Sequence, residues 1–417
     1  MKKSRALDYL QFVQANWRFL SFGILMACSS SFGQTWFIGL FTPNIESTFN
    51  LSHGEWGTIF MIGTLFSAAL LTFTGSFIDK VSLKYYSVLV CGFLAVACAA
   101  IAVTPNVMFL VLAVFLLRHA GQGLATHVAV TGMIKHFYRN RGKAVAIATM
   151  GFPIGRGVLP ILITTSIVAI GWRETYLACV IIIVFIILPA VILLLRGSSQ
   201  NCSESRNSSN SVTSAFIKPR FEPTLIQTLQ KPLIYLIIPA LLAPSFFDTA
   251  LSFHILPIAE LKSWPVTWIT TGYTIYGIAT ILSSIWIGPI LDKVGSKYYF
   301  AYSLIPYLLG LLVLVTFETP IWAWVYLGLF GVGSGLRATI VPVVLSEFYG
   351  TQHIGAIRSF VATLGVLASA IGPPTLGFAL DQNVSISLMT TFAITYFILA
   401  IFLALYASLL EKKTKQP

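Results

Sequence analysis

The segment Gly75–Tyr86, GSFIDKVSLKYY, decides the fold, because a second version of it, GPILDKVGSKYY, occurs at Gly288–Tyr299. A further matching pair follows in the same order, with GQGL at Gly121–Leu124 and GSGL at Gly333–Leu336. The shared order and spacing indicate that each half of the chain is a copy of one ancestral unit. A duplicated, strongly apolar chain is typical of membrane transporters.

The composition predicts a protein that is solvated by lipid. Of 417 residues, 56% are hydrophobic and 10% are charged, whereas soluble domains are about one quarter charged. A membrane helix needs about 20 apolar residues, and roughly twelve such stretches occur, six on each side of residues 197–231. The apolar runs are continuous rather than alternating, which favours helices over a barrel. The expected fold class is an all-α membrane protein with about twelve transmembrane helices in two six-helix, pseudo-symmetric bundles.

The chain is expected to divide into an N-terminal bundle over 1–196, a linker over 197–231 and a C-terminal bundle over 232–417. The linker is rich in Ser and Asn and lacks apolar periodicity, which predicts a mobile loop. The expected helices are 18–43, 54–78, 84–104, 107–136, 143–169, 173–195, 232–260, 266–291, 297–316, 320–347, 353–379 and 385–410.

The distribution of charge predicts the orientation in the membrane. The net charge is +12, and most of the 26 Lys and Arg fall on the side of the predicted termini and linker. Basic loops stay on the cytoplasmic side, so both termini are expected in the cytoplasm, in a bacterial inner membrane. The surplus charge is therefore a topology signal with anionic lipid as its partner, and nucleic acid is not expected. We expect no cofactor and no metal, because the five cysteines show no ligand spacing, and no enzyme, because no nucleotide-binding loop or nucleophile–base arrangement occurs.

The paired Gly-x-x-x-Asp-Lys motifs between helices 2 and 3 and between helices 8 and 9 resemble those of the major facilitator superfamily. In that family the motif locks the cytoplasmic ends of the two bundles. The resemblance implies a gate in which glycine permits close helix contact and aspartate accepts hydrogen bonds from a helix N-terminus or a basic residue. The gating residues expected on this basis are Gly75, Asp79, Lys80, Gly288, Asp292, Lys293 and Arg141.

Two further segments resemble the monocarboxylate and oxalate–formate branch of that superfamily. One is KHFYRNRGKAVAIATMGFPIGRGVLP at 135–160, and the other is FIGLFTP at 37–43. That branch carries its substrate-binding cations on helices 8 and 11. Here helix 8 has no basic residue and helix 11 has only Arg358. The expected substrate class therefore depends on other polar residues within the membrane.

Charged residues inside a membrane helix normally face a cavity or a partner. On helix 107–136, Arg118 and Gln122 fall in one sector, with His127 at its edge. The family resemblance places helices 1, 4, 7 and 10 around a central cavity, so Arg118 and Arg337 would face each other across it and hold an anion; structural pairing is the alternative. Arg156 either joins them or pairs with a carbonyl at a helix break. The expected substrate-binding residues are Arg118, Arg337, Gln122, Gln34, Arg156, His127, Tyr273 and Tyr276.

Helix 232–260 carries the candidates for proton coupling, Asp248 and His254. Asp248 is the acidic residue placed deepest in the membrane, which makes it the plausible proton carrier among the carboxylates. A static salt bridge to one of the arginines is the alternative. His254 titrates near neutrality if exposed, although a membrane histidine is more often simply hydrogen-bonded.

These features predict a secondary active transporter that works by alternating access, most simply as a monomer in the lipid bilayer. The expected substrate is a small organic anion that bears a carboxylate, coupled to protons or exchanged for a counter-anion. Two alternatives remain open. One is an exporter of drugs or siderophores, and the other is a transporter-like nutrient sensor without net flux.

Overall fold

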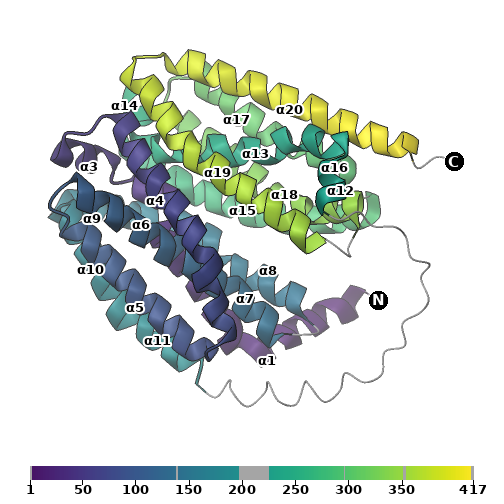
Figure 1. Cartoon of the computed structure of the whole chain (residues 1–417), viewed down its shortest axis with the longest axis horizontal. Helices are drawn as coiled ribbons and strands as arrows, with labels where there is room; N and C mark the ends of the chain where they lie inside the picture. The colour runs from purple at the N-terminus through teal and green to yellow at the C-terminus, as the bar shows by residue number, and fades with distance from the viewer. Residues whose placement is uncertain (1, 138–139, 197–224, 295, 351–353, 415–417) are drawn as a thin grey trace. The chain divides into compact units, whose positions relative to one another are not determined.

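The computed structural model describes residues 2–137, 140–196, 225–294, 296–350 and 354–414; the side chains of residues 1–9, 292–294, 298 and 411–414 lie outside that description. All regular elements of the described residues are helices, and no strand occurs among them (Figure 1). The predicted all-α class is confirmed.

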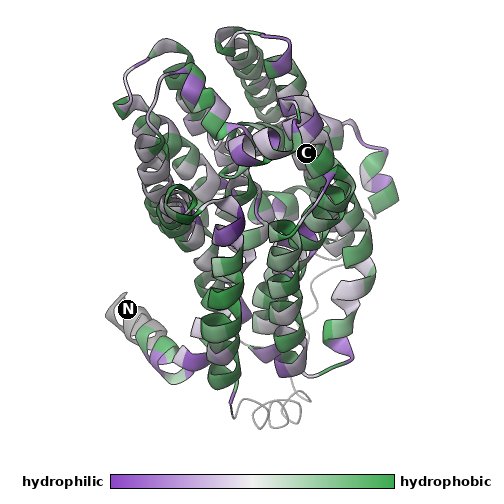
Figure 2. Ribbon diagram, turned by 90° about the vertical axis from the view of Figure 1, so that its left-hand side faces the viewer, coloured by the Kyte–Doolittle hydropathy of each residue, from purple (hydrophilic) through white to green (hydrophobic). Residues whose placement is uncertain are grey.

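Eleven helices in the described part of the chain are long and apolar enough to cross a membrane. Hydrophobic residues run along most of the length of the helices (Figure 2). Many large apolar side chains are exposed on these helices, among them Phe73, Val168 and Trp286, which are 70%, 89% and 77% exposed. In water such surfaces would be unfavourable, so they are the surfaces that lipid solvates.

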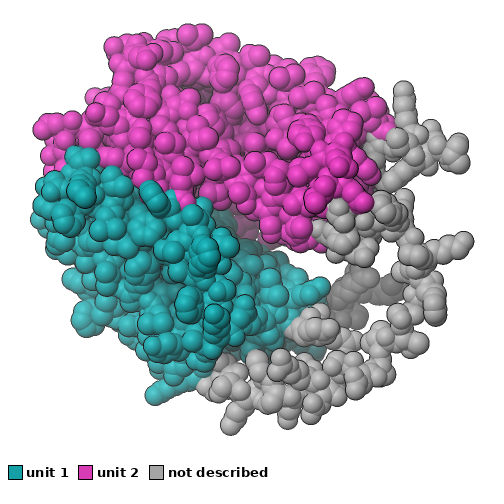
Figure 3. All heavy atoms as spheres, in the orientation of Figure 1, with its two compact units in different colours: residues 1–34, 66–155, 166–217 teal, residues 35–65, 156–165, 218–417 magenta. Residues whose placement is uncertain are grey.

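The chain forms two compact units (Figure 3). The first comprises residues 1–34, 66–155 and 166–217, and the second comprises 35–65, 156–165 and 218–417. The predicted division into bundles 1–196 and 232–417 is not tested by this partition and stays a prediction. Most of the predicted linker, residues 197–224, lies outside the described residues; its end was predicted incorrectly as a loop, because Leu225–Leu229 form a short helix, α12.

In the first unit, α1 packs on α7 and α8, and α5 packs on α10. The helices of this unit are α1 (Lys2–Ser29), η1 (Ser30–Gly33), η2 (Gly75–Asp79), α5 (Leu83–Ala102), α6 (Val107–Leu117), η3 (Arg118–Ala125), α7 (Thr126–His136), α8 (Arg141–Thr149), α10 (Trp172–Ile182), η4 (Ile183–Ile187) and α11 (Leu188–Leu194). Two helices, α4 (His53–Thr74) and α9 (Gly151–Ile170), contribute residues to both units.

In the second unit, α15 packs along α18, and α13 packs against α19 and α20 (Figure 1). Its helices, besides α12, are α2 (Thr35–Gly39), α3 (Thr42–Phe49), α13 (Pro232–Phe253), α14 (Ile255–Leu261), α15 (Val266–Val294), α16 (Lys297–Tyr302), α17 (Ile305–Thr316), α18 (Ile321–Tyr349), α19 (Ile354–Asp381) and α20 (Ile386–Thr414).

Several helices expected to be continuous are broken, and proline explains the positions of the breaks. A proline ring clashes with the carbonyl four residues earlier and offers no N–H to it, so a helix tends to end at that earlier residue. Gly39 ends α2 before Pro43, Thr149 ends α8 before Pro153, Phe253 ends α13 before Pro257, and Tyr302 ends α16 before Pro306. The expected helices 143–169 and 297–316 correspond to the apolar spans Arg141–Ile170 and Tyr299–Thr316, each interrupted by a turn, whereas the span expected at 232–260 ends at Phe253.

The expected first helix, 18–43, was also wrong, because α1 begins at Lys2 and ends at Ser29. The side chains of Ser29 and Ser30 bond back to the carbonyls of Leu25 and Ala27, a pattern that competes with the helical ladder. The backbone tightens into η1, and Gln34 then takes an extended conformation with φ −79° and ψ 151°. These changes separate α1 from the short helices α2 and α3.

Candidate functional site

Arg156 and Asp248 form a bidentate ion pair within the second unit. Arg156 Nη1 donates to Asp248 Oδ2 over 3.2 Å, and Nη2 donates to Oδ1 over 3.1 Å. The two side chains are 12% and 21% exposed, so the pair is largely removed from solvent. Bidentate geometry of this kind is the strong form of an arginine–carboxylate contact.

Helices α9, α13 and α15 supply the residues around the pair. On α13, Ser252 lies one turn after Asp248; its hydroxyl accepts from Arg156 Nη2 over 2.7 Å and donates to Asp248 Oδ1 over 3.1 Å. On α15, the Tyr276 hydroxyl donates to Asp248 Oδ2 over 3.2 Å. Thr274 joins α15 to α9 by donating to the carbonyl of Gly157 over 2.6 Å.

Two tyrosine rings cover the guanidinium group of Arg156. Its Cζ lies 3.7 Å from the ring centroid of Tyr276 and 5.2 Å from that of Tyr273. Both tyrosines are buried, at 2% and 0% exposure. Such stacking favours arginine over lysine, because the planar guanidinium can stack and bond at once. The Nε of Arg156 is buried and has no hydrogen-bond partner among the described residues.

The structure thus brings together four of the residues that the sequence singled out: Arg156, Asp248, Tyr273 and Tyr276. The salt-bridge alternative for Asp248 is the arrangement observed. The other alternative for Arg156, pairing with a carbonyl at a helix break, does not describe these hydrogen bonds, which are all to side chains. The pair is electrically neutral as it stands, so an anion can replace Asp248 on Nη1 and Nη2 only if Asp248 gives up the guanidinium.

Arg337 lies elsewhere in the second unit, on α18. Its Nη2 donates to the carbonyl of Leu241 over 3.1 Å, while its buried Nη1 has no hydrogen-bond partner among the described residues. Arg337 and the ion pair belong to the same unit.

Arg118 belongs to the first unit and is 1% exposed. Its Nη1 donates to the carbonyl of Gly33 over 2.8 Å. It begins η3, a π-helical segment that also contains Gln122, and π-helical turns occur frequently at functional sites. That Arg118 and Arg337 face each other across one cavity stays a prediction.

The chain shows an extended match to a known protein family. The profile described as "Major Facilitator Superfamily" matches residues 23–373, which is most of the chain. The chain belongs to the major facilitator superfamily. It is therefore a multi-pass membrane protein of a family of secondary transporters and not an enzyme.

Solved structures agree on the fold of this major facilitator. One is a bacterial homologue of the human lysosomal transporter Spinster, in an inward-facing and unoccupied conformation. It matches with a TM-score of 0.61 and 13% identity, over 94% of this chain and 96% of that one. No curated protein is similar enough in sequence to count as a match. Identity this low supports the fold alone, and neither the specific branch nor the substrate.

The first copy of the major facilitator motif makes a contact of the expected kind. Asp79 accepts from Lys135 Nζ over 2.8 Å, and the same nitrogen donates to the carbonyl of Ile78 over 2.9 Å. Lys80 instead lies over the ring of Phe77 at 5.3 Å. Arg141 is exposed at the start of α8. Lys135 is thus a basic partner of the motif that the sequence alone did not single out.

The second copy is less informative. The side chains of Asp292 and Lys293 lie outside the described residues. A Cβ at Gly288 would meet nothing within 4 Å in the described part of the chain, and one at Gly75 would meet His127 at 3.6 Å. The nearest neighbour of Gly75 is thus a side chain of α7, and the close helix contact expected at the two glycines stays a prediction.

The remaining expected residues lie apart from the ion pair. His127 Nε2 lies 3.1 Å from the carbonyl of Gly75, next to the gating motif. Gln34 donates to Ser30 over 3.4 Å, and Gln122 is half-buried within η3. His254 Nε2 lies 2.8 Å from the carbonyl of Pro373, so this histidine is bonded away from Asp248. Ser252 was missed, although its i+4 spacing from Asp248 signals that the two share a face.

Replacing Lys135 by Gln should slow transport while leaving the folded protein intact. The pair is exposed, at 44% for Lys135 and 69% for Asp79, so its loss should hardly change thermal stability. A gate contact that must form and break in each cycle should show its loss in the rate instead. Uptake rate and melting temperature would be measured together, with Lys135→Arg as the control that keeps the charge. Normal uptake by Lys135→Gln would contradict a gating role for this pair.

Proposed function

We propose that this transporter moves a small organic anion across a bacterial inner membrane by alternating access, with both termini in the cytoplasm. The observation that carries the proposal is the neutral Arg156–Asp248 pair, held between two tyrosines and largely buried. A carboxylate substrate presents the same two oxygens to arginine as Asp248 does. Substrate and Asp248 therefore compete for one guanidinium group.

Competition of this kind couples substrate binding to protons. When Asp248 is protonated it loses its charge, so its ion pair with Arg156 is lost. The guanidinium is then free to bind the substrate anion. When the anion leaves, Asp248 returns its proton and pairs with Arg156 again. The occupied and empty sites are then both neutral, which favours the conformational change in a low-dielectric interior. One anion and one proton would cross together.

The second arginine of the unit supports an anionic cargo. Arg337 Nη1 and Arg156 Nε are both buried donors without a partner among the described residues. Buried donors are nearly always satisfied, so orphans at two arginines indicate places where an acceptor is missing. A carboxylate, or a second acceptor group of the same substrate, supplies what such donors lack.

The purified protein in detergent would first be screened by thermal shift against small carboxylates and their neutral amides. Each amide matches its acid in size and shape but lacks the charge. Stabilisation by an acid and not by its amide is the expected result. The responding acid would then be followed into vesicles, once with an imposed proton gradient and once by counterflow at equal pH. Uptake that follows the gradient supports coupling to protons; counterflow alone supports anion exchange.

A protein stabilised only by neutral or cationic compounds would overturn the organic-anion proposal. That result would favour the alternative of an exporter of drugs or siderophores. Binding without any uptake or counterflow would instead favour a sensor without net flux.

A further inference from the structure

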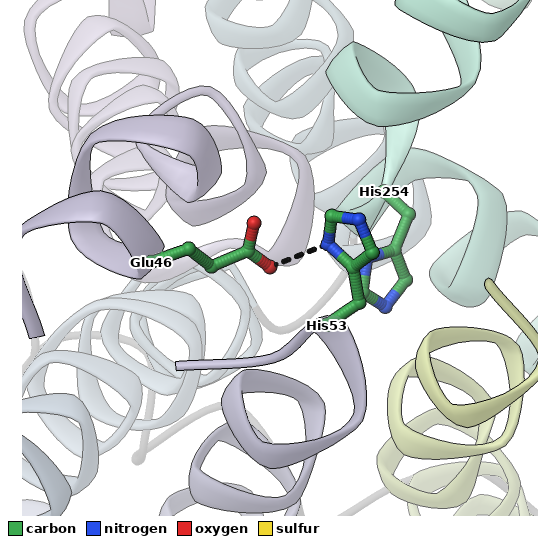
Figure 4. A group of neighbouring side chains, drawn as sticks. All are labelled: Glu46, His53 and His254. Carbon is green, nitrogen blue, oxygen red and sulfur yellow. Dashed lines mark hydrogen bonds and ion pairs between the residues drawn. The ribbon is translucent and has the colours of Figure 1, made fainter. Parts of the chain in front are cut away.

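A second group of polar residues lies in the same unit, away from the Arg156–Asp248 pair. Glu46 comes from α3, His53 begins α4, and His254 occupies the break between α13 and α14 (Figure 4). Glu46 Oε1 and His53 Nδ1 are 2.8 Å apart. The ligand-type atoms of the three side chains all lie within 4.8 Å of one another. Helix packing has thus gathered a carboxylate and two imidazoles from three elements.

His254 is prepared for a further contact on its inner side. It is 0% exposed, and its Nε2 lies 2.8 Å from the carbonyl of Pro373. A carbonyl only accepts, so Nε2 carries the hydrogen and Nδ1 carries the lone pair. That buried Nδ1 has no partner among the described residues. A histidine that donates one ring N–H to a carbonyl and leaves the other nitrogen bare is the usual arrangement of a metal ligand.

The backbone of His53 is held from outside the group. The carboxylate of Asp381, at the end of α19, accepts from the backbone N–H groups of His53 and Gly54 over 2.9 and 2.8 Å. This contact fixes the first turn of α4 and leaves the His53 ring to face Glu46 and His254 (Figure 4).

We propose that Glu46, His53 and His254 form a binding site for a divalent transition-metal ion, with Zn²⁺ as the best fit. Two imidazoles and one carboxylate suit zinc and its first-row neighbours, whereas Mg²⁺ and Ca²⁺ prefer sites built from oxygen alone. Three protein ligands leave one tetrahedral position for water.

The geometry requires only a small adjustment. Ligand atoms around tetrahedral zinc are about 3.3 Å apart, given metal–ligand bonds of about 2.0–2.2 Å. The ligand-type atoms here are at most 4.8 Å apart, so rotation of the side chains closes the difference without moving a helix. The His53 side chain is 33% exposed, which leaves a path for the ion to enter.

A bound ion would connect parts of the chain that are far apart in sequence. Glu46 and His53 lie near the end of the first predicted helix, and His254 lies in the second half of the repeat. The sequence places the loop that contains Glu46 on the outer face of the membrane, so the ion would arrive from outside the cell. A bound ion would hold α3, the start of α4 and the break between α13 and α14 in one arrangement, and it would slow any step of the transport cycle that moves these elements. The site is separate from Arg156 and does not depend on the identity of the substrate.

The test is direct metal binding by the full-length protein, purified with a tag that contains no histidine and stripped with a chelator. Titration calorimetry with Zn²⁺ should show one ion per chain with a Kd of about 1 µM or tighter. Co²⁺ should give the visible absorption of a tetrahedral site, and Zn²⁺ should displace it. Mg²⁺ should give no signal. Absence of saturable Zn²⁺ binding by the wild-type protein would overturn the proposal by itself.

Variants then assign the ligands. Glu46→Gln, His53→Asn and His254→Asn should each weaken Zn²⁺ binding by about 100-fold or more, since even partners of ligands contribute 10- to 100-fold. Glu55→Gln is the matched control for the carboxylate, because Glu55 lies outside the cluster. Glu55 caps α4, the helix that His53 begins, and its carboxylate accepts from Ser52 N–H over 2.9 Å. His136→Asn is the control for imidazole, since His136 stacks on Phe19 in the first unit. Unchanged affinity in a folded Glu46→Gln variant, or equal loss in the controls, would place the metal elsewhere and refute the site.

Discussion

Replacing Arg156 by Gln should eliminate binding of the anionic substrate and destabilise the protein at the same time. Substrate binding fails because the guanidinium is the group for which substrate and Asp248 compete. Stability falls because Asp248 stays behind as a largely buried carboxylate without its cation, and breaking such a pair costs about 3 kcal/mol. Arg156→Lys keeps the charge but loses the bidentate guanidinium geometry and the stacking on Tyr276. This variant should therefore bind the substrate measurably more weakly than wild type does.

Asp248→Asn should have a different effect. It removes the competitor without removing Arg156, so the variant should still bind the substrate and exchange it by counterflow. Accumulation driven by a proton gradient should be lost, because no carboxylate is left to carry the proton beside Arg156. Combining Arg156→Gln with Asp248→Asn removes both charges and should recover part of the stability lost in Arg156→Gln, with a coupling of about 1–3 kcal/mol.

Three measurements on these four proteins separate the roles: melting temperature, equilibrium binding, and uptake under a proton gradient. A static salt bridge predicts loss of stability in both single variants and no selective effect on proton-driven uptake. Intact gradient-driven uptake in Asp248→Asn would therefore remove Asp248 as the carrier. Tight binding of the anion by Arg156→Gln would remove Arg156 from the binding site.

The sequence predicted the members of this site better than their partners. A charge inside an apolar helix is visible from composition alone, which is why Arg156 and Asp248 could be identified. Which arginine would meet Asp248 depends on how α9, α13 and α15 are rotated about their axes. That rotation is set by tertiary contacts such as Thr274 to Gly157, which no local pattern records.

The helix breaks could have been predicted more fully. Proline at 43, 153, 257 and 306 ends the preceding helix four residues earlier in each case, by a clash that depends on local chain geometry only. Yet Pro160 and Pro342 lie inside continuous helices, so the rule states where a break is permitted and neighbouring packing decides whether it forms. His254 lies at such a break, between α13 and α14, in the group with Glu46 and His53.

The repeated glycine motif has a physical explanation in helix packing. In its first copy, Gly121 lies against the backbone of η1, where a Cβ would come within 2.5 Å of Gly33 N and 2.6 Å of Gly33 Cα. The position equivalent to Gly121 in the second copy is Gly333, where a Cβ would meet the ring of Tyr307. At the next glycine of that copy, Gly335, a Cβ would collide with the carbonyl of Thr280 and the hydroxyl of Ser283. Each copy thus marks a crossing where two helical segments touch closely because no side chain stands between them.

Gly121→Ala should therefore be among the most destabilising single substitutions in the chain. The added methyl group meets main-chain atoms of Gly33, which cannot rotate away, so η1 and η3 must separate. Overpacking typically costs 1–3 kcal/mol, and contact with the backbone of η1 should place this variant at about 3 kcal/mol. The carbonyl of Gly33 also holds Arg118, so separation of the two segments would disturb that arginine as well.

Gly92→Ala is the matched control, because it makes the same chemical change in α5 of the same unit, where a Cβ would meet nothing within 4 Å. There the methyl group should be neutral or slightly stabilising, since alanine loses less conformational freedom in a helix than glycine does. Thermal unfolding of the two variants in one detergent gives the comparison, and folded yield gives a second readout if Gly121→Ala does not survive purification. Equal melting temperatures for Gly121→Ala and Gly92→Ala would show that η1 and η3 are not in backbone contact, and steric exclusion of a side chain would no longer explain glycine at residue 121.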